Sequence, residues 1–104
     1  MRKLNKQDIE ELYQAVLSLE SVREAGHFFR DLLTETEIQE FAERWKAARM
    51  LAAGTSYTQI IEQTGLSSTT VARVARWVKR GTGGYRLAMR RVRRNGIQTE
   101  TTQR

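Results

Sequence analysis

The sequence predicts an all-α fold of about six helices, and three of its features support this prediction. Apolar residues recur three and four positions apart along most of the chain. No stretch alternates apolar and polar residues in the way that half-buried strands do. Capping patterns, in which a Ser or Thr is followed three positions later by Glu or Gln, predict helix starts at several places.

Two amphipathic helices are predicted at the start of the chain. The first covers residues 6–19, where apolar residues lie at helical spacing. Ser21 and Glu24 form a capping box, which predicts the start of the second helix. The apolar residues on one face of the second helix are expected to be buried; they are Val22, Ala25, Phe28, Phe29 and Leu32.

The third predicted helix is the longest, at about 19 residues. Thr34 and Glu37 repeat the capping-box pattern at its start. Gly54 follows its last apolar residues, and glycine commonly ends a helix because it accepts a left-handed backbone. The pattern therefore predicts that this helix ends just before Gly54.

A short helix, a glycine turn and a longer helix are predicted over residues 56–80. A capping pattern at Ser56 begins the short helix, and Gly65 ends it after about two turns. Ser67 and Ser68 are candidates to cap the following helix, whose valines lie on one face. This order of elements is the layout of a helix-turn-helix motif that binds DNA.

Charge is distributed unevenly along the chain. Residues 1–43 carry five basic and ten acidic side chains, a net charge of −5, whereas residues 44–104 carry thirteen basic and two acidic side chains, a net charge of +11. Clustered Lys and Arg residues release condensed counterions when they neutralise phosphates. The second half of the chain is therefore predicted to bind a polyanion, although a basic surface without a partner is the simpler alternative.

The second helix of the motif carries small hydroxyl residues at its start and basic residues further along. Small side chains let a helix N-terminus approach the floor of the major groove, and an arginine one turn later reaches a guanine or a phosphate. The residues predicted to contact double-stranded DNA are Ser67, Ser68, Thr69, Thr70, Ala72, Arg73, Arg76, Lys79 and Arg80. The alternative for each is structural: the serines act only as caps, and the basic residues form a solvated face.

Arginines are dense in a last predicted helix over residues 85–94. Three interpretations of this helix stay open: a solvated face, a clamp on the DNA backbone, and a helix that lies on anionic lipid. For the whole chain, the alternative function is an RNA- or protein-binding module that uses the helix-turn-helix as a scaffold. Few aromatic residues are available to stack on unpaired bases, which favours double-stranded DNA over single-stranded RNA.

An enzyme is not expected. His27 is the only histidine, and no cysteine or nucleophile motif accompanies it, so we predict no catalytic residue, no metal site and no cofactor. The absence of cysteine also excludes disulfides. No apolar stretch approaches the roughly 20 residues that cross a bilayer. We therefore expect a cytoplasmic protein that does not associate with membranes.

The length of 104 residues predicts a single domain over residues 1–94 and a disordered tail over residues 95–104, where apolar residues are almost absent. A domain of this size buries only about two thirds of the surface that its unfolded chain exposes. A dimer interface would add to this burial, so we expect a homodimer.

Residues 32–78 resemble the Trp repressor superfamily, most closely its YerC/YecD-type branch. Two stretches carry the resemblance. The family's third helix and its end are similar to Leu32-Leu33-Thr34 followed by Glu37, Arg44, Leu51 and Gly54. The family's helix-turn-helix is similar to the stretch from Ser56 to Arg73, which includes Gly65, Thr70 and Val71.

The resemblance implies an intertwined homodimer that regulates transcription, as a repressor, by binding a pseudo-palindromic DNA site. In such a dimer, residues 1–53 would be the dimerisation helices, residues 56–80 the helix-turn-helix, and residues 85–94 a helix that covers the dimer core.

The resemblance also implies an effector pocket. The positions that correspond to the hydroxyl and guanidinium groups of the family's tryptophan pocket are Thr34, Arg44, Thr70 and Arg73. The tryptophan-binding member has glycine at the next position, where this chain has Val74, and an isopropyl group there would fill the space of the indole. We therefore expect that tryptophan is not the corepressor, while another small effector stays open.

Overall fold

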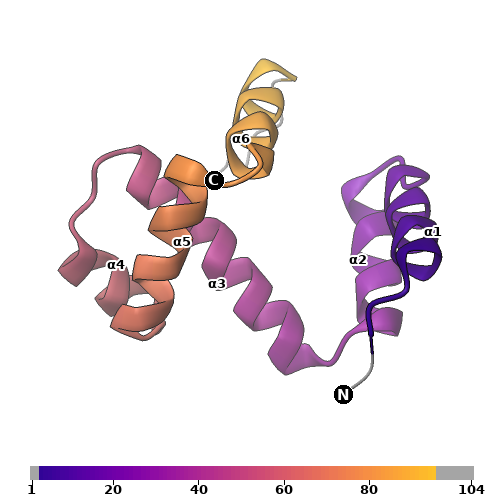
Figure 1. Ribbon diagram of the computed structural model, residues 1–104, viewed down its shortest axis with the longest axis horizontal. Helices are drawn as coiled ribbons and strands as arrows, with labels where there is room; N and C mark the ends of the chain where they lie inside the picture. The colour runs from indigo at the N-terminus through magenta and orange to yellow at the C-terminus, as the bar shows by residue number, and fades with distance from the viewer. Residues whose placement is uncertain (1–2, 96–104) are drawn as a thin grey trace. The chain divides into compact units, whose positions relative to one another are not determined.

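A computed structural model of the protein describes residues 3–95, which form six α-helices and no strand. The helices are α1 (Lys6–Leu17), α2 (Val22–Leu32), α3 (Glu35–Ala52), α4 (Tyr57–Thr64), α5 (Ser68–Arg80) and α6 (Gly84–Arg94) (Figure 1). The all-α prediction is confirmed. Apart from Asn95, the predicted tail lies outside the described residues. None of the helices within residues 3–95 is long and apolar enough to cross a membrane.

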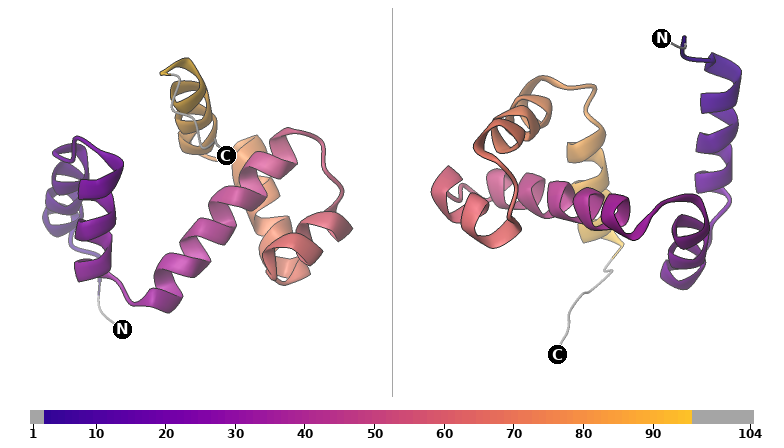
Figure 2. Two further views of the ribbon diagram at one scale, coloured as in Figure 1. Left: turned by 180° about the vertical axis from the view of Figure 1, so that it is seen from behind. Right: turned by 90° about the horizontal axis from the view of Figure 1, so that it is seen from below.

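The chain divides into two compact units, Met1–Ile38 and Gln39–Arg104, and the division falls within α3. The first unit contains α1, α2 and the first turn of α3. The second unit contains the rest of α3 with α4, α5 and α6. Within the second unit, α5 contacts both α4 and α6 (Figure 2).

The helix starts predicted from capping patterns are confirmed in the first unit. The backbone N–H of Glu24 donates to Ser21 Oγ at 3.0 Å. The backbone N–H of Glu37 donates to Thr34 Oγ1 at 3.1 Å, and the Glu37 carboxylate accepts from the backbone N–H of Thr34 at 2.9 Å. These bonds satisfy N–H groups that lack a partner within the helix, so α2 and α3 begin where the sequence indicates.

The two helices of the first unit bury no residue within this single chain. Leu17 is 83% exposed, Tyr13 is 62% exposed and Val22 is 79% exposed. The expected burial of one face of α2 is therefore not found at Val22, or at Leu32, which is 49% exposed. The physical reason is size, because two short helices offer each other too little surface to enclose an apolar face.

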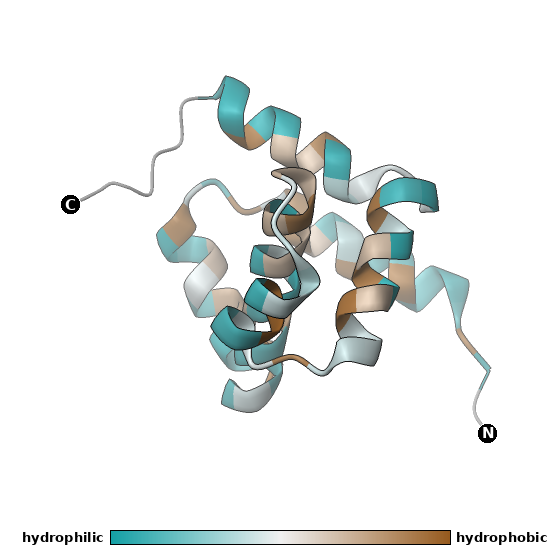
Figure 3. Cartoon of the chain, turned by 90° about the vertical axis from the view of Figure 1, so that its left-hand side faces the viewer, coloured by the Kyte–Doolittle hydropathy of each residue, from teal (hydrophilic) through white to brown (hydrophobic). Residues whose placement is uncertain are grey.

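The second unit contains the hydrophobic core. Its buried members come from α3, α4, α5 and the turn between the last two; they are Ala47, Ala48, Ile60, Leu66, Val71, Val74 and Val78. Tyr85 and Met89 of α6 pack against this cluster as partly buried residues. Figure 3 shows the cartoon coloured by hydropathy, and α6, which leads into the grey C-terminal trace, is mostly hydrophilic. The core therefore holds together the helices that present the predicted helix-turn-helix.

Candidate nucleic-acid interface

The turn between α4 and α5 is held by a glycine and a buried threonine. Gly65 has φ = 78°, the left-handed conformation that glycine adopts without a Cβ clash, and its N–H donates to the Ile61 carbonyl oxygen at 2.9 Å. Thr64 is 5% exposed, and its hydroxyl donates to the Ile60 carbonyl oxygen at 2.7 Å. The same hydroxyl accepts from the Leu66 N–H at 3.2 Å. The predicted glycine turn is confirmed, whereas the part played by Thr64 was not anticipated.

The hydroxyl residues at the start of α5 differ in what they contact. The Ser67 hydroxyl caps the helix, since it accepts from the Thr70 N–H at 3.1 Å, and it donates to Thr70 Oγ1 at 3.0 Å. Ser68 and Thr69 are exposed and form no side-chain hydrogen bond with any residue of the described chain. Ser68 and Thr69 therefore keep their full hydrogen-bonding capacity for a ligand, while Ser67 and Thr70 are engaged in the cap.

The two faces of α5 have opposite character. Val71, Val74, Ala75 and Val78 are buried. The predicted contact residues beyond the first turn are all exposed; they are Ala72, Arg73, Arg76, Lys79 and Arg80. Residues three and four positions apart share a helix face, so Thr69, Ala72, Arg73 and Arg76 form one continuous exposed stripe. The sequence prediction of an inward valine face and an outward basic face is confirmed.

The basic residues of α5 have no carboxylate partner among residues 3–95. The ion pairs there join Arg30 to Glu35 at 3.8 Å and Arg44 to Glu40 at 2.5 Å. The positive charge of α5 is therefore uncompensated by nearby acids. Such a surface attracts polyanions, and this attraction weakens with added salt.

The four residues of the implied effector pocket lie in different surroundings. Thr34 belongs to the first unit, where its hydroxyl is engaged with Glu37, and Thr70 is engaged with the cap of α5. Arg44 pairs with Glu40, while its Nε atom is buried without a hydrogen-bond partner in the described structure. Arg73 is exposed.

Val74 stands at the position where the tryptophan-binding member of the family has glycine, and where its isopropyl group was expected to fill the space of the indole. It is 3% exposed and belongs to the core cluster. Its side chain therefore packs against protein atoms.

The sequence did not predict the contacts by which α6 is held against α5 and α3. Arg86 Nε donates to the Val78 carbonyl oxygen at 2.7 Å, which ties α6 to the C-terminal end of α5. The Tyr85 ring stacks on Trp45 of α3, with ring centroids 6.3 Å apart. No pattern in the sequence pairs these residues, because each contact joins helices across a turn or across the fold.

Comparisons with known proteins agree with this architecture. The sequence model of the family described as Trp repressor protein matches residues 7–93. The protein YerC of Bacillus subtilis is 39% identical over 99 residues, which cover 95% of this chain and 91% of YerC. The crystal structure of a TrpR-like protein from Eubacterium eligens is 38% identical, with a TM-score of 0.76 over 90% of this chain and 94% of that one. A protein from Staphylococcus aureus whose crystal structure is described as that of a Trp repressor has 34% sequence identity to this chain. The two structures match with a TM-score of 0.76 over 90% of this chain and 91% of that one. The chain therefore belongs to the Trp repressor family, as a YerC-type Trp-repressor-like protein.

Proposed function

We propose that this protein is a transcriptional regulator that binds double-stranded DNA through α5. The observation that carries the proposal is the exposed stripe on α5, where small hydroxyl residues precede uncompensated cations on a helix whose opposite face is buried. Membership of the Trp repressor family supports the same function. A rigid recognition helix of this composition suits the major groove, which admits an α-helix and displays the base edges.

The exposed residues of α5 divide into two roles. Ser68, Thr69, Ala72 and Arg73 lie toward the N-terminal half and are proposed to contact base edges. Arg76, Lys79 and Arg80 lie toward the C-terminal half and are proposed to contact phosphates, which set the position of the helix in the groove. Ser67 and Thr70 contribute through the cap, which orders the first turn of the recognition helix.

The proposed active form is a homodimer on a pseudo-palindromic site. Exposed apolar side chains of the first unit favour a dimer, because a partner chain would cover them. Leu17 and Val22 are 83% and 79% exposed in the single chain. A two-fold dimer would place two recognition helices in successive major grooves about 34 Å apart. Repression is the proposed mode of action, since the family model that matches this chain is described as Trp repressor protein.

Tryptophan is not the proposed corepressor. The Val74 side chain is 3% exposed and packs within the core cluster. An indole bound at this position would therefore have to displace a packed isopropyl group. Titration calorimetry with L-tryptophan is expected to show no saturable binding below about 1 mM, which corresponds to roughly −4 kcal/mol. Saturable binding in that range would contradict this part of the proposal.

The test of the proposed function is selection of bound duplexes from a random pool, followed by binding measurements at two salt concentrations. Arg73→Ala is expected to cost about 1 to 3 kcal/mol and to relax preference at one base position. Lys79→Ala is expected to weaken all sequences similarly and to lower the salt slope by about one.

Lys6→Ala is a matched control for these variants, because it removes the same positive charge at an exposed residue of α1 that is outside the proposed contact set. Unchanged affinity and unchanged preference in Arg73→Ala would refute base contact by Arg73. Preferential binding of a single-stranded RNA competitor would instead favour the RNA-binding alternative.

A further inference from the structure

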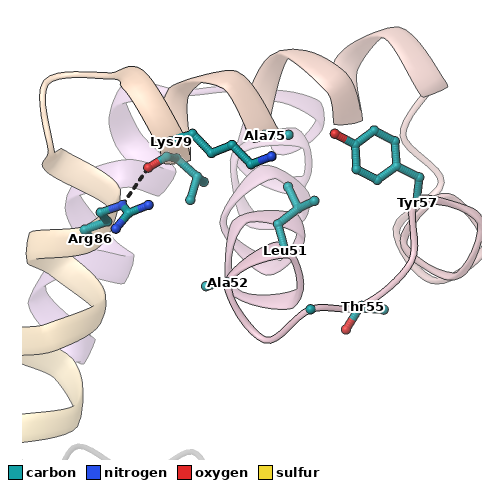
Figure 4. Close-up of a pocket in the computed structure, with 9 residues that line it drawn as sticks. Leu51, Ala52, Thr55, Tyr57, Ala75, Lys79 and Arg86 are labelled. Atoms are coloured by element: carbon teal, nitrogen blue, oxygen red, sulfur yellow. Dashed lines mark hydrogen bonds between the residues drawn. The ribbon is translucent and has the colours of Figure 1, made fainter.

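A cavity of about 380 Å³ lies in the second unit, where the end of α3 and the following loop meet α4, α5 and α6 (Figure 4). Its apolar wall is formed by Leu51, Ala52, Ala75 and Val78. Its polar groups are the side chains of Thr55, Tyr57, Lys79 and Arg86. None of the residues implied in the family's tryptophan pocket lines this cavity, so it is a separate feature of the chain.

The Arg86 guanidinium is held at one end of the cavity. Its Nε atom donates to the Val78 carbonyl oxygen at 2.7 Å, and Figure 4 shows this bond as a dashed line. The two terminal nitrogens of the guanidinium form no hydrogen bond with any residue described in the structure. A guanidinium anchored through Nε keeps its terminal N–H groups available for a carboxylate or a phosphate.

The cavity is positively charged. Lys79 is a second cation of its lining, no acidic residue lines it, and the ion pairs among the described residues involve neither Lys79 nor Arg86. In Figure 4 the Lys79 amine and the Tyr57 hydroxyl lie on the α5 side of the cavity, and Arg86 lies at the end nearest α6. Two uncompensated cations beside an apolar wall favour an anion that also carries an apolar group.

We propose that this cavity binds a small organic anion, a carboxylate or phosphate monoester with a compact apolar body. Arg86 binds the anionic group at the α6 end of the cavity, and the apolar body packs against Leu51 and Ala52. Lys79 and Tyr57, on the α5 side, add a positive charge and a hydrogen-bond donor to the lining. A backbone phosphate of DNA is a less suitable occupant, because it brings no apolar group to cover this wall. Lys79 also belongs to the proposed DNA surface, so an anion bound here would lower the charge that α5 presents to DNA.

Binding of phenyl phosphate and of inorganic phosphate, measured without DNA by amide chemical shifts in NMR, tests the proposal. Phenyl phosphate is expected to bind at least about tenfold more tightly than inorganic phosphate, because its ring covers the apolar wall. The largest shifts are expected at Gly54, Thr55 and Lys79. Arg86→Gln and Lys79→Gln are each expected to weaken binding of phenyl phosphate by about tenfold or more.

Arg91→Gln is the matched control, since it removes the same charge from α6 at a residue that does not line the cavity. Equal affinity for the two phosphates, or equal effects of Arg86→Gln and Arg91→Gln, would overturn the proposal. So would an Arg86→Gln variant that binds phenyl phosphate normally but DNA with a reduced salt slope, because the cavity would then serve the DNA backbone. Circular dichroism of each variant tests whether the total helix content is retained. Since the binding is measured without DNA, failure of the proposed DNA function leaves this test intact.

Discussion

The two units of the chain differ in how they use their apolar residues. In the second unit, α3, α4 and α5 enclose a cluster in which Ala47, Ala48, Ile60 and Val71 are each 0% exposed. In the first unit, α1 and α2 have comparable amphipathic patterns, yet neither helix contains a buried residue. The same kind of sequence pattern therefore leads to a closed core in one unit and to an exposed apolar face in the other.

This difference indicates separate tasks for the two units. A closed core holds α5 rigidly, which suits a helix that must present side chains to a groove. An exposed apolar face has a free-energy cost in water unless another surface covers it, so it is suited to a permanent interface. The proposed homodimer assigns the first unit to assembly and the second unit to DNA.

The largest expected effect follows from removing a core side chain in the second unit. Ile60 is fully buried, so Ile60→Ala is expected to lower the free energy of unfolding by about 2–5 kcal/mol through lost transfer energy and the cavity left behind. Chemical denaturation followed by Trp fluorescence measures the loss. Leu87→Ala, at a residue of α6 that is 38% exposed, is the control and should cost much less. Equal losses would show that the buried cluster is not the main source of stability.

A charge on the exposed face of the first unit should disrupt assembly. Leu17→Glu is expected to convert dimers to monomers and to lower affinity for a two-half-site duplex on the order of 100-fold, because the second half-site is no longer bound in tandem. Sedimentation velocity and DNA titration provide the two measurements. Gln14→Glu adds the same charge at an exposed polar residue of α1 and should leave both unchanged. A Leu17→Glu protein that remains dimeric would exclude this face as the interface.

The buried polar group of the second unit gives a smaller effect. Thr64→Val retains the volume of the side chain but leaves the Leu66 N–H without its partner, so a loss of about 1–3 kcal/mol in the free energy of unfolding is expected. Thr64→Ser keeps the hydroxyl and should recover most of this loss. If the valine variant were as stable as the wild type, the hydroxyl would not be what holds the turn.

Helix caps give the smallest effect and compare the units directly. Ser21→Ala and Ser56→Ala each remove one capping oxygen, at a cost of about 1 kcal/mol. Both tryptophans, Trp45 and Trp77, lie in the second unit, so fluorescence follows that unit whereas far-UV circular dichroism follows all helices. Ser56→Ala should shift the fluorescence transition, and Ser21→Ala should shift it less. Equal shifts would show that the two units unfold together.

Much of the proposed DNA surface could be predicted because its signals are local. The left-handed turn at Gly65, the cap at Ser67 and the alternation of valines with polar residues on α5 each depend on residues within about one or two turns of a helix. The anchoring of Arg86 to Val78 and the stack of Tyr85 on Trp45 depend on how α6 folds back after α5, and no spacing rule encodes that direction. The exposure of Val22 and Leu32 was also mispredicted, since an apolar stripe indicates that a face is to be covered but not that the same chain covers it.

The sequence by itself determined the helical class, the helix starts and the polarity of α5, because hydrogen-bonding caps and helical periodicity act between neighbours along the chain. Only the tertiary structure decided which apolar faces are enclosed, how Thr64 satisfies the turn, and which residues line the cavity with Lys79 and Arg86. These features depend on the packing of helices that are distant in sequence, where burial and charge are set by the whole set of neighbours rather than by any one segment.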